Sequence, residues 1–435
     1  MEKRFDEFSS VSLSEFEAQL VKDLRGKPLE FLTNSPEDGI EVTAYSHKEH
    51  NIAPNNLAGL RPSKGWVIRK EISADTGNKT VLEYLNAGVT GLGLHSLENL
   101  SSQNKDVLFQ HIYADLKLDA KSAAGHHEIN ENIHLIFDPI ADAMLDGEDL
   151  VDLDNFVNYV SRYDNHNSIS VDGSIYGNAG ATSIQELGMS LAHFNEYLNA
   201  LTKGKDDASI APLIQKSVLN LSVTENYFVN IAKFRALRIL LKSLFEGYDY
   251  TGGIQPKIGA KTSSRTYAVN DANNNLLRAT TQGMSAVLGG CDVLTVNTEK
   301  LDDTELNSIH ERIGKNISLV LQEEAHLDKV DDPGAGSYYI EKITNILVEE
   351  GWKLFLSIEE EGGLIASMNA GNIHTSIKKS ADKLIERLNT AKITLLGINK
   401  FQNSMEEYKT IKPLEATGKA LLPLKLEAHY SSVEA

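Results

Sequence analysis

The chain has 435 residues, of which 41% are hydrophobic, so it can bury a sizeable core in one large domain or in two to three ordinary domains. Its 61 acidic residues outnumber its 42 Lys and Arg, and the resulting net charge of -19 argues against binding to nucleic acid or to an anionic membrane. The single cysteine, Cys291, excludes an internal disulfide, and the sequence has no apolar leader or membrane-length apolar run. These features predict a cytoplasmic globular protein.

An N-terminal arm is predicted over residues 1–65. Ser12 followed by Glu15 is a capping-box pattern, and apolar residues at helical spacing come directly after it. The chain then runs loosely to Gly65. We therefore expect one helix and an extended segment rather than a compact domain.

Between residues 66 and 400, eight short strand-like runs are separated by segments of helix length. The runs are 66–73, 91–96, 134–139, 167–174, 256–262, 292–298, 317–322 and 393–399. This alternation is typical of a parallel α/β sheet covered by helices, and eight units predict a (β/α)8 TIM barrel, with a doubly wound open sheet as the alternative. After residue 400 we expect a short helical C-terminal tail over 401–435.

One face of these strands is small or polar. In 168–172, for example, Ser168, Ser170 and Asp172 alternate with Ile169 and Val171. The residues that we expect to line the barrel bore are Arg69, His95, Ser168, Ser170, Asp172, Lys257 and Thr295. Ordinary parallel barrels are apolar on both strand faces, so a polar inner face indicates either a polar ligand along the axis or charged side chains that pair with one another. An antiparallel sheet with one wet face is a further alternative, which the intervening helices disfavour.

The segment 170–182, SVDGSIYGNAGAT, reads as a strand that enters a glycine-rich loop. Its glycines, Gly173, Gly177 and Gly180, do not have the spacing of a phosphate-binding loop. Elsewhere, the pair His126 and His127 lacks the spacing that places two imidazoles on one helical face, so we predict no metal site.

Several segments, in order, resemble the methylmalonyl-CoA mutase family. Leu321–Glu324 and Asp332–Glu341 are similar to the family's Leu-Gln-Gln-Glu and Asp-Pro-x-x-Gly-Ser-x-Tyr-Val-Glu motifs. The other similar segments are 21–33, 66–69, 168–182, 232–240, 271–290 and 395–401. The resemblance spans almost the whole chain. It implies a (β/α)8 barrel that threads acyl-CoA along its axis and works with adenosylcobalamin held by a separate domain.

The sequence departs from this family at the positions to which the resemblance assigns chemistry. Where catalytic chains have Tyr-His after the glycine that matches Gly173, this chain has Ser174 and Ile175, and Ile175 cannot donate a hydrogen bond to the thioester. The degenerate catalytic positions are Glu71, Ile175, Gly259 and Lys261. The remnant of the barrel-mouth loop comprises Gly173, Ser174, Ile175, Gly177 and Gly180. We therefore expect no catalytic residue in this chain.

The family's Asp-x-His-x-x-Gly motif is also absent, so we expect no cobalamin-binding domain and no cofactor bound by this chain. The resemblance implies a non-catalytic small subunit, a barrel over 66–400 that stabilises a large catalytic subunit carrying adenosylcobalamin. We expect the arm over 1–65 to wrap that partner, and the isolated chain to be able to form a homodimer. Two alternatives are a substrate-binding subunit whose cobalamin domain is a separate chain, and a non-enzymatic acyl-CoA-binding protein. The sequence leaves methylmalonyl-CoA and isobutyryl-CoA both open as the partner's substrate.

Overall fold

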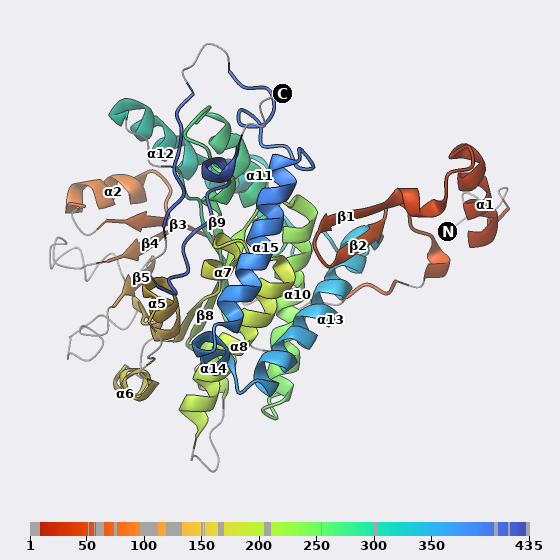
Figure 1. Ribbon diagram of the computed structural model, residues 1–435. Coiled ribbons are helices and arrows are strands. Elements are labelled where there is room, and N and C mark those ends of the chain that lie inside the picture. The colour runs from red at the N-terminus through yellow and green to blue at the C-terminus, as the bar shows by residue number, and fades with distance from the viewer. Residues whose placement is uncertain are drawn as a thin grey trace.

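Eight parallel strands form one sheet, and strands that are consecutive in the chain are neighbours in space (Figure 1). The computed structural model describes residues 9–50, 52–55, 57, 65–73, 76–95, 112–118, 133–148, 151, 153–163, 169–203, 210–253, 255–299, 303–403, 408–415 and 418–431. The strands are β3 (Val67–Ile72), β4 (Gly91–Leu94), β5 (Tyr113–Lys117), β6 (Ile133–Ile136), β7 (Ile169–Asp172), β8 (Ser217–Val223), β9 (Lys257–Thr262) and β10 (Val293–Thr295). Their order is β6-β5-β4-β3-β10-β9-β8-β7, so the first strand pairs with the last. This confirms the (β/α)8 barrel and excludes the open and antiparallel alternatives.

The barrel closes between β6 and β7 through a hydrogen bond to a side chain. Asp138, which directly follows β6, accepts a hydrogen bond from the Asp172 backbone N–H at 2.7 Å. The same carboxylate caps α5 (Pro139–Asp146) by accepting from the Ala141 N–H, and it also accepts from Tyr197 and His193. Burial raises the pKa of Asp138, but its contacts with His193 and Tyr197 outweigh burial and hold the pKa below its ordinary value. The carboxylate is therefore ionised at neutral pH.

Helices surround the sheet, and the longest ones pack side by side on one flank (Figure 1). The further helices are α2 (Asn78–Asn86), α6 (Leu153–Arg162), α7 (Ser174–Asn178), α8 (Ser183–Thr202), α9 (Ala211–Gln215), α10 (Tyr227–Glu246), α11 (Asn274–Leu288), α12 (Thr304–Leu319), α13 (Tyr338–Glu360), α14 (Leu364–Asn369) and α15 (Asn372–Asn389). Gly188 of α8 lets α13 approach closely, because a Cβ there would lie 3.0 Å from the Gly351 carbonyl oxygen. The main hydrophobic core fills the space between these helices and the strands.

The N-terminal segment extends away from the barrel (Figure 1). The predicted capping box at Ser12 and Glu15 is confirmed at the start of α1 (Leu13–Asp23), which buries none of its residues. A hairpin of β1 (Thr33–Glu37) and β2 (Ile40–Thr43) follows, and β2 packs against α13. Asn55 then donates from its backbone and side chain to Glu341 of α13. The segment is thus attached at the hairpin and at Asn55, whereas α1 is half exposed.

Six of the eight predicted strands are confirmed, and two are wrong. Residues 317–322 form the end of α12 and a π-helical turn, Val320–Glu324. Residues 393–399 make only an isolated bridge between Leu396 and Lys400. A short apolar run suits a strand or a buried helix end equally well, and only the tertiary context decides between them.

Two strands were not predicted from the sequence. β5 is only five residues long, and Ala114 and Leu116 are the only apolar residues that alternate there with Asp115 and Lys117, which is too short a pattern to mark a strand. A single residue, Lys216, separates β8 from α9, so no turn signal marks the start of that strand.

The expected helical tail is also wrong for the described residues after 400. The only helix there is a short 3-10 turn, Leu426–His429. The tail instead bonds to other elements: Leu421 N–H donates to the Met144 carbonyl and Leu424 N–H to the Asn178 carbonyl, both at 2.8 Å. Pro413 and Pro423 each remove a backbone donor, which favours this extended path over a helix.

Candidate functional site

Arg69 occupies one side of the barrel bore. From β3 its guanidinium reaches past β4 to Asp115 on β5, where two N–H groups donate to the two carboxylate oxygens, each at 2.6 Å. It also donates to the Thr295 hydroxyl at 3.2 Å. Only 8% of the Arg69 side chain and 3% of the Asp115 side chain is exposed. Gly93 makes the path possible, because a Cβ there would lie 2.0 Å from an Arg69 nitrogen.

Glu71, one of the degenerate catalytic positions, has two polar partners in the bore. It contacts the Arg69 guanidinium, and one of its oxygens lies 3.2 Å from His95 Nε2. Burial raises the pKa of Glu71, but the hydrogen bond from His95 and the charge of Arg69 more than reverse this and lower it. A carboxylate held ionised in this way is a poor general base.

A second set of contacts crosses the bore from the opposite strands. Lys257 of β9 places its ammonium 5.1 Å from the centre of the Tyr113 ring on β5, and that ring stacks on His134 of β6. In the strand order β5 and β9 are four places apart, which in an eight-stranded barrel means opposite walls. Burial and the charge of Lys257 lower the pKa of His134 to about 3, so the imidazole is neutral at pH 7. At this level, side chains from opposite walls therefore meet across the bore.

Nearer the mouth, Lys261 of β9 forms an ion pair with Asp172 of β7 at 2.7 Å. Ser174 donates to the other oxygen of Asp172. Gly259 lies beneath the side chain of Asn220, and a Cβ there would be 2.0 Å from the Asn220 amide oxygen. Of the two explanations for a polar inner face, the described residues therefore support charges that pair with one another.

Two further predicted bore residues are not linked to this network. Ser170 is buried on β7, and its hydroxyl has no hydrogen-bond partner within the described part of the chain. Ser168 lies outside the described residues.

The predicted mouth loop is partly helical. Ser174–Asn178 form α7, and Ile175 is buried there with only 7% exposure. The glycines serve close packing: a Cβ on Gly173 would lie 2.0 Å from the Ser190 hydroxyl, and one on Gly177 would lie 2.1 Å from the Ser222 hydroxyl. Gly180 has a φ of +104°, which other residues rarely adopt. The glycines are explained by the backbone path and by packing, without a bound ligand.

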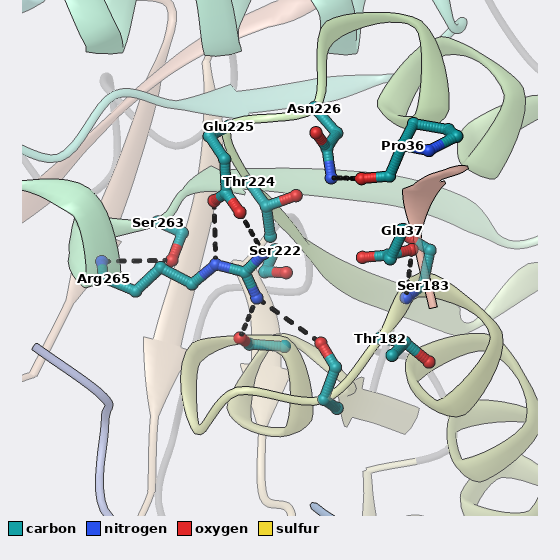
Figure 2. A network of polar contacts seen from close by, with 12 residues as sticks. Pro36, Glu37, Thr182, Ser183, Ser222, Thr224, Glu225, Asn226, Ser263 and Arg265 are labelled. Carbon is teal, nitrogen blue, oxygen red and sulfur yellow. Dashed lines mark hydrogen bonds and ion pairs between the residues drawn. The ribbon is translucent and has the colours of Figure 1, made fainter. Parts of the chain in front are cut away.

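Beyond this mouth lies a charged cluster that sequence reasoning missed (Figure 2). Arg265, which is 3% exposed, forms two hydrogen bonds with Glu225, at 2.9 and 2.8 Å, and donates to the Gly177 and Ala181 carbonyls of the mouth loop. Glu37 of β1 accepts from the Ser183 N–H, and burial raises the pKa of its carboxyl despite the nearby Arg265. The arginine follows a predicted strand, but its carboxylate partners are distant in the sequence, so no local pattern reveals the cluster.

The same cluster borders a cavity of about 310 Å³. Arg278 of α11 and Lys383 and Arg387 of α15 contribute further cations to its walls. None of these residues was a candidate from the sequence.

The motifs that carry the family resemblance meet in space. Arg235 of α10 is fully buried and bonds both Asp332 and Glu341, at 2.9 and 2.8 Å. These two acids stand in the Asp332–Glu341 motif, 10 residues from end to end. Through Arg235 they hold α10 to the start of α13.

Within the described ranges, no group of three or more His, Cys, Asp or Glu is placed to bind a metal ion. A search of the same residues for a helix of membrane-spanning length and hydropathy finds none.

Comparison with known proteins identifies the family. The family model for methylmalonyl-CoA mutase matches residues 150–425. A protein from Porphyromonas gingivalis named methylmalonyl-CoA mutase small subunit is 32% identical, over 93% of this chain and 72% of that protein. The small subunit from Propionibacterium freudenreichii subsp. shermanii is 28% identical over 91% of this chain and 69% of its own length.

A third relative is matched over a shorter region. The methylmalonyl-CoA mutase of Rhizobium meliloti is 33% identical over 55% of this chain, and the match covers 34% of that protein. The fold, the order of the motifs and the extent of the two long matches agree with one another. This chain belongs to the methylmalonyl-CoA mutase family.

Proposed function

We propose that this chain is the non-catalytic small subunit of an adenosylcobalamin-dependent methylmalonyl-CoA mutase and that it stabilises a large catalytic subunit. The observation that carries this proposal is the contact of Lys257 with Tyr113 from opposite walls of the barrel. An acyl-CoA threaded along the barrel axis, as the family resemblance implies, would have to pass through that space. The names of the two relatives matched over most of this chain support the same assignment.

The side chains near the mouth support an inactive barrel. Ile175 is buried and has no donor for a thioester oxygen. Glu71 and Lys261 are both engaged in ion pairs, so neither is free to act as an acid or a base. Together these residues offer no group that would orient an acyl-CoA thioester.

Adenosylcobalamin, when bound, supplies the radical for the rearrangement. The described mouth offers the cofactor no free imidazole of the kind that ligates its metal: His193 is completely buried against Asp138 and Tyr176, and His95 Nε2 faces Glu71 at 3.2 Å. We therefore place the cofactor on the large subunit and derive no step through it for this chain.

The N-terminal arm supports a partner-binding role. Helix α1 buries no residue, although Phe16 and Leu20 lie on it at helical spacing. Val21 is 39% exposed and Phe31, just beyond the helix, is 61% exposed. An amphipathic helix gains most of its stability from packing its apolar face, so we expect a partner chain to cover α1.

The test is to assay the purified chain alone and after co-expression with the large subunit of the same source. We expect no conversion of methylmalonyl-CoA by the isolated chain, even with adenosylcobalamin and a free cobalamin-binding chain. We also expect the large subunit to co-purify with it and to gain thermal stability. Turnover without the large subunit would refute the proposal and favour a substrate-binding subunit. Tight binding of a CoA ester without co-purification would favour an acyl-CoA-binding protein.

A deletion of residues 9–24 tests the arm. It should weaken co-purification with the large subunit and leave the barrel's circular dichroism unchanged, apart from the lost helix. Size-exclusion chromatography of the isolated chain will show whether it forms the expected homodimer.

A further inference from the structure

The cavity of about 310 Å³ lies outside the barrel bore, beyond the carboxyl ends of β8 and β9. Its walls come from segments far apart in the sequence: the β1 hairpin, the turn after β9, α11, α15 and the loop 393–396. A cavity of this size is at the lower end of the range for sites that bind small molecules.

The cavity walls carry more positive than negative side chains, whereas the molecule as a whole is negative. The chain carries a net charge of -19, yet four cations line the cavity against three carboxylates. The lining cations are Arg265, Arg278, Lys383 and Arg387, and the carboxylates are Glu37, Asp38 and Glu225. Placing this many cations at one concave site favours anions over neutral ligands.

Two of the four cations have no hydrogen bond or ion pair with a carboxylate among the described residues. Arg265 is paired with Glu225, and Lys383 with Asp38 at 2.8 Å. Arg278 donates only to neutral oxygens, those of the Asn275 side chain and the Leu396 backbone, each at 2.7 Å. The Arg387 guanidinium has no hydrogen bond or ion pair with any described residue, although this side chain is half-buried. Planar guanidinium groups of this kind bind carboxylates and phosphates through paired N–H donors.

A second observation points to a ligand. Thr266, which is 5% exposed, is one of the residues that line the cavity, and its buried hydroxyl has no hydrogen-bond partner in the described part of the protein. Buried hydroxyl groups are almost always hydrogen-bonded, so an unpartnered one beside a cavity indicates a missing partner. Glu37, on the same wall, has a pKa raised by burial, which weakens its repulsion of an incoming anion.

The remaining wall is apolar. Leu384, Ile393 and Leu396 face the cavity together with Leu426 of the C-terminal turn. A ligand that satisfies both walls has an anionic head and a short aliphatic body.

We propose that this cavity binds a small organic anion whose carboxylate or phosphate head is held by Arg278 and Arg387 and whose aliphatic body packs against Leu384 and Ile393. Glu37 and Asp38 of the arm hairpin line the same cavity as Arg387 of α15, so the ligand would lie between the arm and α15. Ligand that binds only the folded state stabilises it by mass action, so occupancy would strengthen the attachment of the arm. The site is separate from the bore and needs no large subunit.

Isothermal titration calorimetry on the full-length chain tests this proposal with four probes: isobutyrate, succinate, glycerol 3-phosphate and inorganic phosphate. We expect at least one of the organic anions to bind more tightly than inorganic phosphate, because its aliphatic body adds contacts with Leu384 and Ile393. The relative affinities of the two carboxylates and glycerol 3-phosphate show whether the site prefers a carboxylate or a phosphate head group.

The variant Arg387→Gln should weaken the best probe roughly 10-fold to 100-fold, the usual effect of losing a charge-assisted hydrogen bond. Lys379→Gln is the matched control, since it removes the same charge from an exposed position of the same helix. Leu384→Asn should weaken an organic anion and leave inorganic phosphate unchanged. Circular dichroism of each variant confirms that it is folded.

Three results would overturn the proposal: no binding of any probe at millimolar concentration, equal losses in Arg387→Gln and Lys379→Gln, or unchanged affinity in an Arg278→Gln/Arg387→Gln double variant. A negative result would leave the assignment as a small subunit untouched, because that assignment is tested by turnover and co-purification.

Discussion

Replacing Asp115 with Asn removes the charge that holds Arg69 in the bore. The pair is buried, with 8% and 3% of the two side chains exposed, and both carboxylate oxygens accept from the guanidinium. Breaking a buried ion pair by removing one partner costs about 3–5 kcal/mol, because the other charge is left uncompensated. Glu71 still contacts Arg69 in the variant, so we expect the lower figure, about 3 kcal/mol.

The measurement is urea-induced unfolding followed by circular dichroism, supported by thermal unfolding. For a chain of 435 residues, an unfolding entropy of about 2.1 cal/mol/K per residue converts about 3 kcal/mol into a fall in Tm of roughly 3 °C. A double-mutant cycle with Arg69→Met isolates the pair, and we expect the second substitution to cost much less once the first is present.

Asp382→Asn is the matched control, because Asp382 pairs with Lys378 on the surface of α15, where the two side chains are 59% and 76% exposed. It should leave unfolding unchanged. The reasoning is refuted if Asp115→Asn costs less than about 0.5 kcal/mol, the size of a typical surface substitution, or if the two bore substitutions add independently. Either result would mean that Arg69 and Asp115 do not act as a buried, energetically coupled pair.

Three other predictions follow from the same contacts. Gly93→Ala should destabilise the protein by about 1–3 kcal/mol, because the new Cβ would lie 2.0 Å from Arg69 and force it out of place. His134→Phe should make the protein less sensitive to acid. The folded imidazole has a pKa of about 3, so below about pH 6.5 the unfolded chain binds a proton that the folded chain does not bind, and the wild type loses stability. This loss is about 3 kcal/mol at pH 4.5. Glu341→Gln should destabilise the protein most at neutral pH and least in acid. Burial raises the pKa of Glu341, but bonds from Arg235, Gly336 and Asn55 more than reverse this, so the contribution of the carboxylate is present above about pH 4.3 and is lost as the pH falls below that.

Urea midpoints of wild type and each variant, measured at pH 7 and at pH 4.5 or below, decide these cases. For His134→Phe, a difference from wild type that stays constant with pH would contradict the assigned pKa. For Glu341→Gln, a difference from wild type that grows as the pH falls would contradict the lowered pKa of Glu341. For Gly93→Ala, a midpoint equal to that of wild type would show that Arg69 has room to move.

The barrel could be predicted from the sequence because six strands carry clear alternation between helix-length segments. The remaining two, β5 and β8, could not. β5 is only five residues long, and the partner of its buried Asp115 is Arg69, 46 residues earlier in the chain. β8 begins one residue after α9, so no turn separates the two elements. In 317–322, the hydrophobic residues complete α12 instead of starting a strand, and period alone does not separate these outcomes.

The sequence predicts which polar residues line the bore, but it does not predict which of them pair with one another. Alternation placed Arg69, Asp172, Lys257 and Lys261 on one strand face, but which charges meet depends on the strand order and on glycines that leave room above neighbouring strands. The cavity was missed because Arg387, which has no hydrogen bond or ion pair within the described part of the chain, lies on an ordinary amphipathic helix. A single surface-like arginine carries no local signal.

The eight junctions between neighbouring strands of the barrel are not all of one kind, and the junction at the carboxylate of Asp138 is the exception. Seven of the eight junctions are ladders of backbone hydrogen bonds, whereas β6 and β7 are joined within the described residues by one side-chain acceptor and by packing. Local opening follows the least protected contacts, so the amides of β7 should exchange with solvent earlier than those of β9, which has a ladder on both sides. The barrel would then unroll from this junction as a curved sheet, with the β3–β10 ladder still intact at its middle.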